Sequence, residues 1–139
     1  MTSAVVAVSA ALLAAALIGW LMTRRAGRVQ ATDPTASDDL DTSDLGLSAD
    51  GPTVVHFSAS WCGPCGHVRR VVDQVCADLD RVAHVEIDMD ANPGAARRLS
   101  VLSLPTTFIF DADGKQRYRT SGVPKADDLR SALTPLLAP

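Results

Sequence analysis

The chain has 139 residues, enough for one domain with appendages, and carries a formal net charge of −3. Because the chain is mildly acidic and has no basic patch, its composition argues against a nucleic-acid-binding protein. Its three cysteines are too few for the disulfide framework of a small secreted protein. Two of them lie close together, which favours redox chemistry over structural cross-linking.

The first predicted element is an apolar helix over residues 4–22, in which only Ser9 and Gly19 fall outside the strongly apolar or alanine set. At ~1.5 Å per residue this helix spans roughly 28 Å, about one bilayer core. The alternative is a signal peptide cleaved after the small-residue stretch at residues 29–31. The run is long for a signal peptide and no basic residue precedes it, so we expect an uncleaved span in the lipid bilayer through residues 4–22.

The charges that flank this helix predict its orientation. Arg24, Arg25 and Arg28 follow the apolar run, whereas only the amino terminus precedes it. Under the positive-inside rule, the part of the chain after the helix lies in the cytoplasm, and Trp20 sits at the interface. We therefore expect residues 1–28 to be a membrane anchor with a basic flank, with a domain facing outward as the alternative.

Residues 29–52 differ in composition from what precedes and follows them. They contain no lysine or arginine, are rich in Ser, Thr and Pro, and include the aspartates Asp33, Asp38, Asp39, Asp41, Asp44 and Asp50. Such a segment buries little apolar surface and repels itself, which predicts an acidic flexible linker. Leu40, Leu45 and Leu47 are exceptions, and they suggest a short first strand or helix packed on the domain edge.

The remaining residues, 53–139, are predicted to form an α/β domain. The expected elements are a strand at Thr53–Phe57, a helix at Cys62–Asp80, a strand at Val82–Asp88, a short helix at Pro93–Leu99, strands at Thr106–Asp111 and Gln116–Ser121, and a helix at Lys125–Leu137. Asp113 and Gly114 form a hairpin signal between the last two strands. Alternating strands and helices followed by a hairpin predict a central mixed β-sheet flanked by helices.

The motif Trp61-Cys62-Gly63-Pro64-Cys65 stands where the first strand of this domain ends and its first helix begins. Two cysteines at this spacing can close a small disulfide, and the helix N-terminus stabilises the reactive thiolate. Zinc sites use the same cysteine spacing, but the flanking tryptophan and the Gly-Pro pair favour redox chemistry. At every position the motif resembles the active site of the thioredoxin family.

This resemblance implies a thioredoxin-like fold and a reaction of protein disulfides. In the family, the residue matching Cys62 attacks a partner disulfide, and the one matching Cys65 resolves the mixed disulfide to give a Cys62–Cys65 bond. It also implies contacts to the partner from Trp61, Gly63 and Pro64. Disulfide-containing proteins are the expected substrates. The expected reductant is an upstream thiol donor, such as a thioredoxin reductase or a membrane electron donor, and no cofactor or metal is expected.

A second part of the resemblance is the segment Ser103-Leu104-Pro105-Thr106. The family has a cis-proline at the position of Pro105, facing the cysteine pair, where the backbone holds an extended partner segment. We expect Leu104 and Pro105 to bind substrate in this way, the alternative being an ordinary trans proline at a strand edge. Gly122 matches a family glycine near the groove that holds this partner segment, although a plain turn at the strand end would also explain a glycine there.

The chain departs from the family pattern beside the cysteines. His56 stands where the family usually has a buried aspartate that helps to deprotonate the second cysteine, and Glu86 stands where it often has a lysine. Imidazole can accept a proton near neutral pH, so His56 is a candidate catalytic base for Cys65. The alternative is a histidine that only pairs with Glu86 or a backbone carbonyl. Gly66 also replaces a residue that is often basic.

Other residues near the motif predict no chemistry. His67 and Arg69 are expected on exposed helix faces. Cys76 lies about 16 Å along the helix from Cys65, too far for a disulfide or a shared zinc ion, and is expected to be a small core residue. We conclude from the sequence that the chain is a membrane-anchored protein-disulfide reductase. The alternatives are an extracytoplasmic oxidoreductase of the cytochrome-maturation type and a redox-inert adaptor with the same fold.

Overall fold

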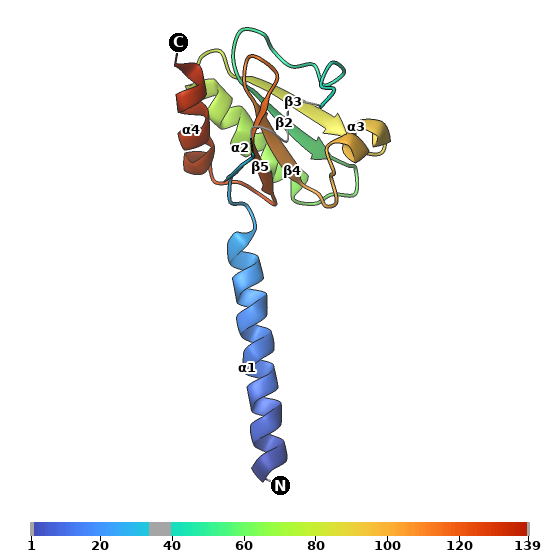
Figure 1. Ribbon diagram of the computed structural model, residues 1–139, viewed down its shortest axis with the longest axis vertical. Coiled ribbons are helices and arrows are strands. Elements are labelled where there is room, and N and C mark those ends of the chain that lie inside the picture. Colours follow the sequence, from blue (N-terminus) through green and yellow to red (C-terminus); the bar gives the residue numbers. More distant parts are fainter. Residues whose placement is uncertain (1, 34–39, 139) are drawn as a thin grey trace.

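A computed structural model describes residues 2–33 and 40–138 of the chain, so Asp38 and Asp39 of the expected linker lie outside the described residues. The first helix, α1 (Thr2–Arg25), projects from the rest of the molecule as a separate rod (Figure 1). An 18-residue stretch within its segment Ala4–Arg25 has a mean hydropathy of 2.4, and no part of that stretch is buried in the protein. By length and composition this helix could cross a membrane or serve as a signal sequence.

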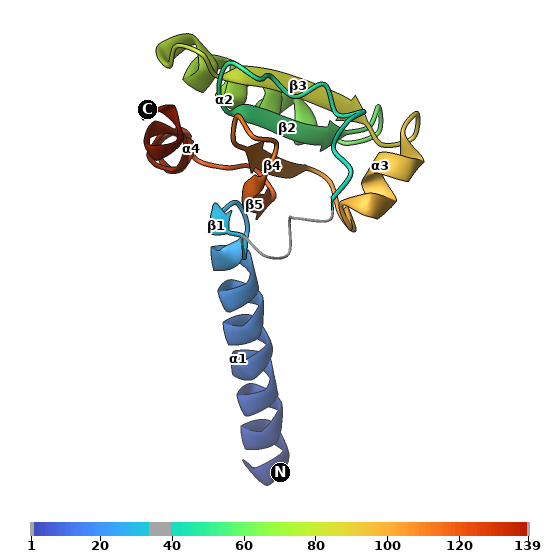
Figure 2. The ribbon, with the colours of Figure 1, turned by 45° about the horizontal axis from the view of Figure 1, so that its top comes forward.

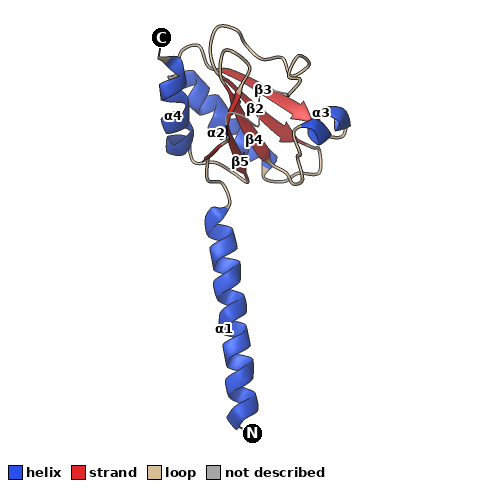
Figure 3. Cartoon of the chain, in the orientation of Figure 1, coloured by secondary structure: helices blue, strands red, loops and turns tan. Residues whose placement is uncertain are grey.

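The rest of the chain folds around a mixed sheet, as the sequence predicts (Figure 3). The strand order is β1-β5-β4-β2-β3, with β2 and β3 parallel and the other pairs antiparallel. The strands are β1 (Gln30–Ala31), β2 (Thr53–Ser58), β3 (Ala83–Asp88), β4 (Thr106–Phe110) and β5 (Gln116–Ser121). The central strands β2 and β4 are buried along their whole length, which fits their runs of β-branched and aromatic residues.

Helices cover both faces of this sheet. On one face, α2 (Cys65–Asp78) and α4 (Ala126–Leu133) pack on alternate residues of the strands, and their core includes Val54 and Ile109. On the other face, α3 (Pro93–Arg98) covers a second core that includes Phe57 and Phe108, whose rings meet edge to face. Side chains of adjacent residues in β2 therefore point into different cores.

Helix boundaries differ from the prediction where prolines lie. α2 begins at Cys65 with Pro64 as its N-cap, so Cys62 lies just outside the helix that was expected to include it. The last helix ends at Leu133 and continues as a 3-10 turn, η2 (Thr134–Leu137), because Pro135 cannot donate the next α-helical hydrogen bond.

The segment from residue 40 to residue 52 is not the extended linker that its composition predicts. Leu45 is only 2% exposed and belongs to the core beneath α3, while Leu40 and Leu47 pack against that core. Arg98 of α3 contacts Asp44 and donates to the Asp41 carbonyl. The three leucines therefore pack on the domain as expected, but in turns and bends rather than in a strand or helix.

The end of α1 is also joined directly to the sheet, as Figure 2 shows. β1 pairs with β5 in the register Gln30–Arg119 and Ala31–Tyr118. Just before β1, the Gly27 N–H donates to the Ser121 carbonyl at 2.6 Å. Gly27 has φ +79°, and a Cβ there would lie 2.3 Å from the Val123 carbonyl oxygen, so only glycine fits. The expected flexible linker is therefore absent at this point.

Candidate active site

The cysteine pair lies in the turn between β2 and α2. Cys62 and Cys65 are joined by a disulfide. Cys62 is half-buried, whereas Cys65, the first residue of α2, is only 3% exposed and its Sγ lies 4.0 Å from the Phe57 carbonyl oxygen. A partner protein can therefore reach Cys62 but not Cys65, which gives the two sulfurs different roles in thiol exchange.

The segment around Pro105 lies at the same end of the sheet. Phe57 of β2 pairs with Thr106 of β4, so the preceding Pro105 lies level with the turn that carries the cysteines. The Leu104–Pro105 bond is cis, and the Gly122 N–H donates to the Pro105 carbonyl at 2.9 Å. The structure thus brings Leu104, Pro105 and Gly122 together beside the cysteine turn.

The exposed rim of the site is set by Trp61, Gly63 and Pro64. The Trp61 side chain is 65% exposed, and its Nε1–H donates to Asp90 Oδ2 at 3.0 Å. Gly63 and Pro64 are exposed at the start of α2. This hydrogen bond fixes a large apolar side chain next to Cys62, where it is available to a docking protein.

Comparison with known proteins decides the family. The sequence model of the family described as thioredoxin matches residues 41–135, more than half of the chain. The thioredoxin of Mycolicibacterium smegmatis is 40% identical over 95 residues, which cover 66% of this chain and 82% of that protein. The chain belongs to the thioredoxin family.

Other relatives agree with this assignment. The thioredoxin of Chlamydia trachomatis is 37% identical over 81 residues, covering 58% of this chain and 78% of that one. The structure of chloroplastic thioredoxin z shares 37% identity with a TM-score of 0.57, over 63% of this chain and 79% of the other. A mutant thioredoxin from Halobacterium salinarum gives a TM-score of 0.58 at 27% identity, over 73% and 83% of the two chains. The predicted fold is therefore confirmed.

The family and the Cys62–Cys65 pair together identify this thioredoxin as a thiol-disulfide oxidoreductase. Such an enzyme takes protein disulfides as substrates and depends on a reductant that restores its dithiol. Among residues 2–33 and 40–138, no group of three or more His, Cys, Asp or Glu side chains is placed to hold a metal ion. The chemistry described below uses only the side chains of this chain.

His56 lies in the middle of β2 with its side chain fully buried. Its neighbour Val54 belongs to the core beneath α2, so alternation along the strand places the His56 ring on the α2 face as well. His56 Nδ1 lies 2.8 Å from His84 Nε2 of β3, and the two rings stack. Burial lowers the pKa of His56 to about 4, although the nearby Glu86 acts to raise it.

The second nitrogen of the His56 ring has no hydrogen-bond partner within residues 2–33 and 40–138. His56 Nε2 lies 3.5 Å from Glu86 Oε1, close enough for an ion pair but without hydrogen-bond geometry. Glu86 is engaged elsewhere, because Arg69 of α2 donates two hydrogen bonds of 2.6 Å to its carboxylate. These bonds lower the pKa of Glu86 to about 2, so it remains ionised beside the ring.

Three residues of this region were missed or misjudged from the sequence. Arg69 was expected to be a plain surface residue, but it holds Glu86. His84 and Asp73 were not considered, yet His84 contacts His56 and its Nδ1 lies 2.7 Å from Asp73 Oδ1. The signal was present in the spacing, since Cys65, Arg69 and Asp73 follow one another at four-residue intervals on one face of α2.

A small cleft lies beside this group of side chains. It has a volume of about 350 Å³ and is lined by Ser58, Ala59, Ser60, Arg69, Glu86 and Asp88. The lining residues extend from the end of β2 to the Arg69–Glu86 pair. The volume of the cleft leaves room for water next to these polar groups.

Cys76, the third cysteine, is half-buried against the α2 core. Burial raises the pKa of its thiol to about 11, which makes it a poor nucleophile.

Proposed function

We propose that this thioredoxin is a single-pass membrane protein that reduces protein disulfides close to the cytoplasmic membrane surface. The observation that supports this most is the direct junction between α1 and the sheet. The helix is long and apolar enough to span a bilayer, and the chain enters the β1–β5 pairing within a few residues of its end. If α1 is inserted, the catalytic domain is held at the membrane surface rather than on a long tether.

The active-site groove, which Leu104, Pro105 and Gly122 form beside the cysteine turn, lies on the side of the domain that faces α1. A Cβ at Gly122 would lie 3.2 Å from the Gly27 nitrogen and 3.6 Å from Ala26 Cβ. A cleft of about 450 Å³ is lined jointly by Met22 and Arg25 of α1 and by Ser103 and Gly122 of the groove. The proposed substrates are therefore proteins that present a disulfide near the lipid surface, which the cysteine turn can reach.

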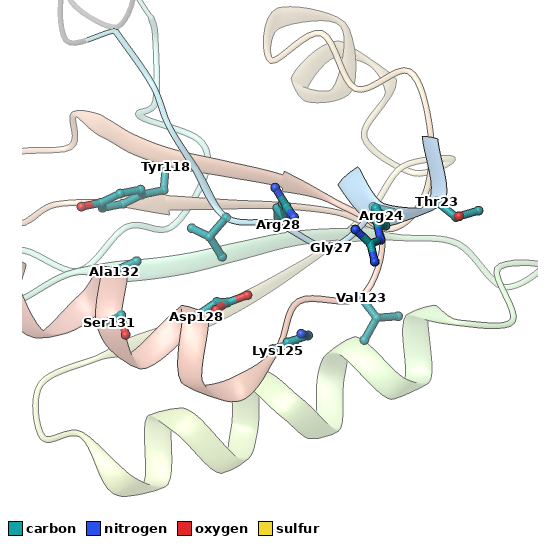
Figure 4. A pocket seen from close by; sticks show the side chains of 12 residues that line it. Thr23, Arg24, Gly27, Arg28, Tyr118, Val123, Lys125, Asp128, Ser131 and Ala132 are labelled. Atoms are coloured by element: carbon teal, nitrogen blue, oxygen red, sulfur yellow. The ribbon is translucent and has the colours of Figure 1, made fainter. Parts of the chain in front are cut away.

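Basic side chains surround the same junction. A cleft of about 830 Å³ lies between the end of α1 and α4, and Arg24, Arg28 and Lys125 line it together with Asp128 (Figure 4). Arg24 also stacks on Trp20, with its guanidinium carbon 3.5 Å from the ring centroid. This arrangement suits an interface with anionic lipid headgroups, where aromatic and basic residues are enriched.

The reaction proceeds in two exchanges. The Cys62 thiolate attacks one sulfur of the partner disulfide, which forms a mixed disulfide and releases the other partner sulfur as a thiolate. The Cys65 thiolate then attacks Cys62 Sγ, which closes the Cys62–Cys65 disulfide and releases the second partner sulfur. Two electrons pass to the partner, and an upstream thiol donor, such as a thioredoxin reductase or a membrane electron donor, reopens the disulfide.

A topology test addresses the membrane part of this proposal. Green fluorescent protein fused after Pro139 should be fluorescent and alkaline phosphatase at the same position inactive, because Arg24, Arg25 and Arg28 hold the domain in the cytoplasm. The opposite pattern would contradict the orientation and favour the extracytoplasmic, cytochrome-maturation type of oxidoreductase. A fusion protein found entirely in the soluble fraction after alkaline extraction would contradict the anchor itself.

The second cysteine needs a proton acceptor, and His56 is the one we propose. Cys65 is a thiol when the dithiol is reduced, and it must lose its proton before it can attack Cys62. His56 lies on the sheet face that α2 covers, its Nε2 has no hydrogen-bond partner among the described residues, and Glu86, 3.5 Å from that nitrogen, lines the cleft of about 350 Å³. A neutral imidazole there can take the Cys65 proton directly or through one water.

Replacing His56 should therefore slow only the second exchange. In His56→Ala the mixed disulfide should form at the normal rate, while its resolution by Cys65 should be slower by about 10²-fold or less. Stopped-flow measurement of both steps separates them. His67→Ala, on the exposed side of α2, is the matched control and should change neither rate. Equal slowing of both steps in His56→Ala would show that His56 serves packing alone.

Replacing His56 by the residue usual in the family should not restore the rate by itself. In His56→Asp, the new carboxylate would lie beside Glu86, and two neighbouring carboxylates raise each other's pKa. Adding Glu86→Lys should recover the resolution rate by supplying the opposite charge. The comparison of the single and double variants in the same stopped-flow assay checks this.

A further inference from the structure

A line of hydrogen-bonded side chains, from His56 through His84 to Asp73, connects the buried ring of His56 to the protein surface. His56 Nδ1 lies 2.8 Å from His84 Nε2, and His84 Nδ1 lies 2.7 Å from Asp73 Oδ1. Exposure increases along this line, from 0% for the His56 side chain to 14% for His84 and 59% for Asp73. The line thus begins at the buried base and ends at a solvated carboxylate on α2.

The positions of the protons follow from what each atom can do. A carboxylate only accepts, so the contact with Asp73 requires a proton on His84 Nδ1. In the neutral ring His84 Nε2 is then an acceptor, so the proton in the contact between the two rings belongs to His56 Nδ1. Neutral His56 must in turn have a lone pair on Nε2, the atom that has no hydrogen-bond partner among the described residues and lies 3.5 Å from Glu86 Oε1.

We propose that Asp73, His84 and His56 form a proton relay that carries the Cys65 proton from beneath α2 to solvent during resolution of the mixed disulfide. This inference rests on the proposed role of His56 and adds two residues to it. His84 is a positioning residue that fixes the His56 tautomer and receives its proton. Asp73 is also a positioning residue, because it accepts a hydrogen bond from His84 Nδ1 and so fixes the tautomer of His84.

The relay lessens an energetic problem that the burial of His56 creates. Burial lowers the pKa of His56 to about 4, whereas an ordinary cysteine thiol has a pKa of about 8.5. His56 would hold the Cys65 proton for a very small fraction of the time near neutral pH. Passing a proton on to His84, which is 14% exposed and lies beside the Asp73 carboxylate, carries the charge from the buried ring to the edge of solvent.

The proton balance is simple. Cys65 loses a proton to His56 Nε2, and the proton on His56 Nδ1 passes to His84 Nε2 across their 2.8 Å contact. His84 is then an imidazolium, and its Nδ1 proton leaves to solvent through the contact with Asp73. No oxidant is consumed, because the Cys65 thiolate attacks Cys62 Sγ and the electron pair of the broken bond leaves with the partner sulfur.

The other charged groups around His56 do not offer an equivalent route. Glu86 of β3 faces Nε2, but Arg69 of α2 occupies its carboxylate with two hydrogen bonds and keeps it ionised. Glu86 and Arg69 therefore form a nearly neutral pair beside the ring. Thr107 of β4, the register neighbour of His56 on its other side, carries no ionisable group. Among the described residues, His84 is the ionisable partner that hydrogen-bonds to the ring.

The tautomer of His56 is a direct test that does not depend on activity. The chain has three histidines, so nitrogen NMR of the full-length reduced protein labelled in histidine gives few signals. In the wild type at neutral pH, His56 should be protonated at Nδ1 and bare at Nε2. In His84→Phe, which keeps a ring but removes its acceptor, the His56 proton should move to Nε2, facing Glu86. Wild-type His56 protonated at Nε2 would overturn the relay.

Kinetics supply the second test. His84→Phe should slow resolution of the mixed disulfide by about as much as His56→Ala, within ~10²-fold, and leave its formation unchanged. The double variant should be no slower than His56→Ala, because the two residues act as one unit. His67→Phe is the matched control. Imidazole added to His84→Ala should restore part of the rate by replacing the missing ring.

Asp73→Asn provides a variant at an exposed position that should fold normally. It keeps an oxygen for His84 Nδ1 but loses the charge, so resolution should slow by a smaller factor and only at this step, while Asp80→Asn should have no effect. If His56→Ala slows resolution of the mixed disulfide but His84→Phe and Asp73→Asn do not, the relay is wrong, while the proposed role of His56 as the base for Cys65 stands. If His56→Ala has no specific effect, both proposals about proton transfer fail together.

Discussion

Cys62→Ser should reduce insulin disulfides no faster than the uncatalysed background, because Cys62 is the sulfur of the pair that a partner can reach. Cys65→Ser should instead form mixed disulfides that persist, since the sulfur that resolves them is gone. Non-reducing gels should show these adducts with substrate proteins, and a thiol reductant should release them. This is the largest effect on activity that we expect from any single substitution in the chain.

Cys76→Ser is the matched control for both variants. Its thiol is half-buried on α2, and its raised pKa keeps it protonated, so activity and gel pattern should match those of the wild type. In Cys65→Ser the adducts should disappear when Cys62→Ser is added. Full turnover in Cys62→Ser or in Cys65→Ser would contradict the assignment of the redox pair, and adducts formed through Cys76 would contradict the assigned roles.

The local parts of the fold were predictable from the sequence. Periodicity and turn signals give the strands and helices of residues 53–139 to within a few residues, and the signal is clearest for β2 and β4, which are short runs rich in β-branched and aromatic residues. The motif from Trp61 to Cys65 and the proline at position 105 then specify the family. The interpretation of the described residues 29–33 and 40–52 as a flexible linker was wrong, because acidic composition outweighed the three leucines in the prediction.

The long-range parts of the site could not be predicted in the same way. His56 was recognisable because it replaces a family residue next to the motif, but its link to His84 depends on the pairing of β2 with β3 and on the two rings stacking. Asp73 joins them only because α2 crosses that part of the sheet. Such contacts are set by tertiary packing, and a single sequence carries only the helical and strand spacing that permits them.

The two cores of the domain have different consequences for function. The polar line from His56 to Asp73 lies on the sheet face that α2 covers, next to the core under α2, and it begins at a fully buried base. The core under α3 contains the aromatic residues Phe57, Phe108 and Phe110. This second core also includes Leu45, which comes from the residues before position 53.

Leu45→Ala should destabilise the domain by about 2–5 kcal/mol, the usual range for removing a buried leucine side chain. Leu45 is 2% exposed and belongs to the core that contains Phe57, Phe108 and Leu99. Chemical denaturation followed by tryptophan fluorescence measures the change, since Trp61 lies at the active site. The expected loss is a large part of the ~5–15 kcal/mol that holds a typical domain together.

Leu102→Ala is the matched control for this variant, because the Leu102 side chain is 92% exposed. It removes the same atoms but should change the free energy of unfolding by no more than about 0.5 kcal/mol. If Leu45→Ala were equally harmless, residues 40–52 would be a linker after all, and a domain starting at Thr53 would fold by itself. If it is destabilising, the folded unit begins near Leu40 and includes the segment whose composition suggested a tether.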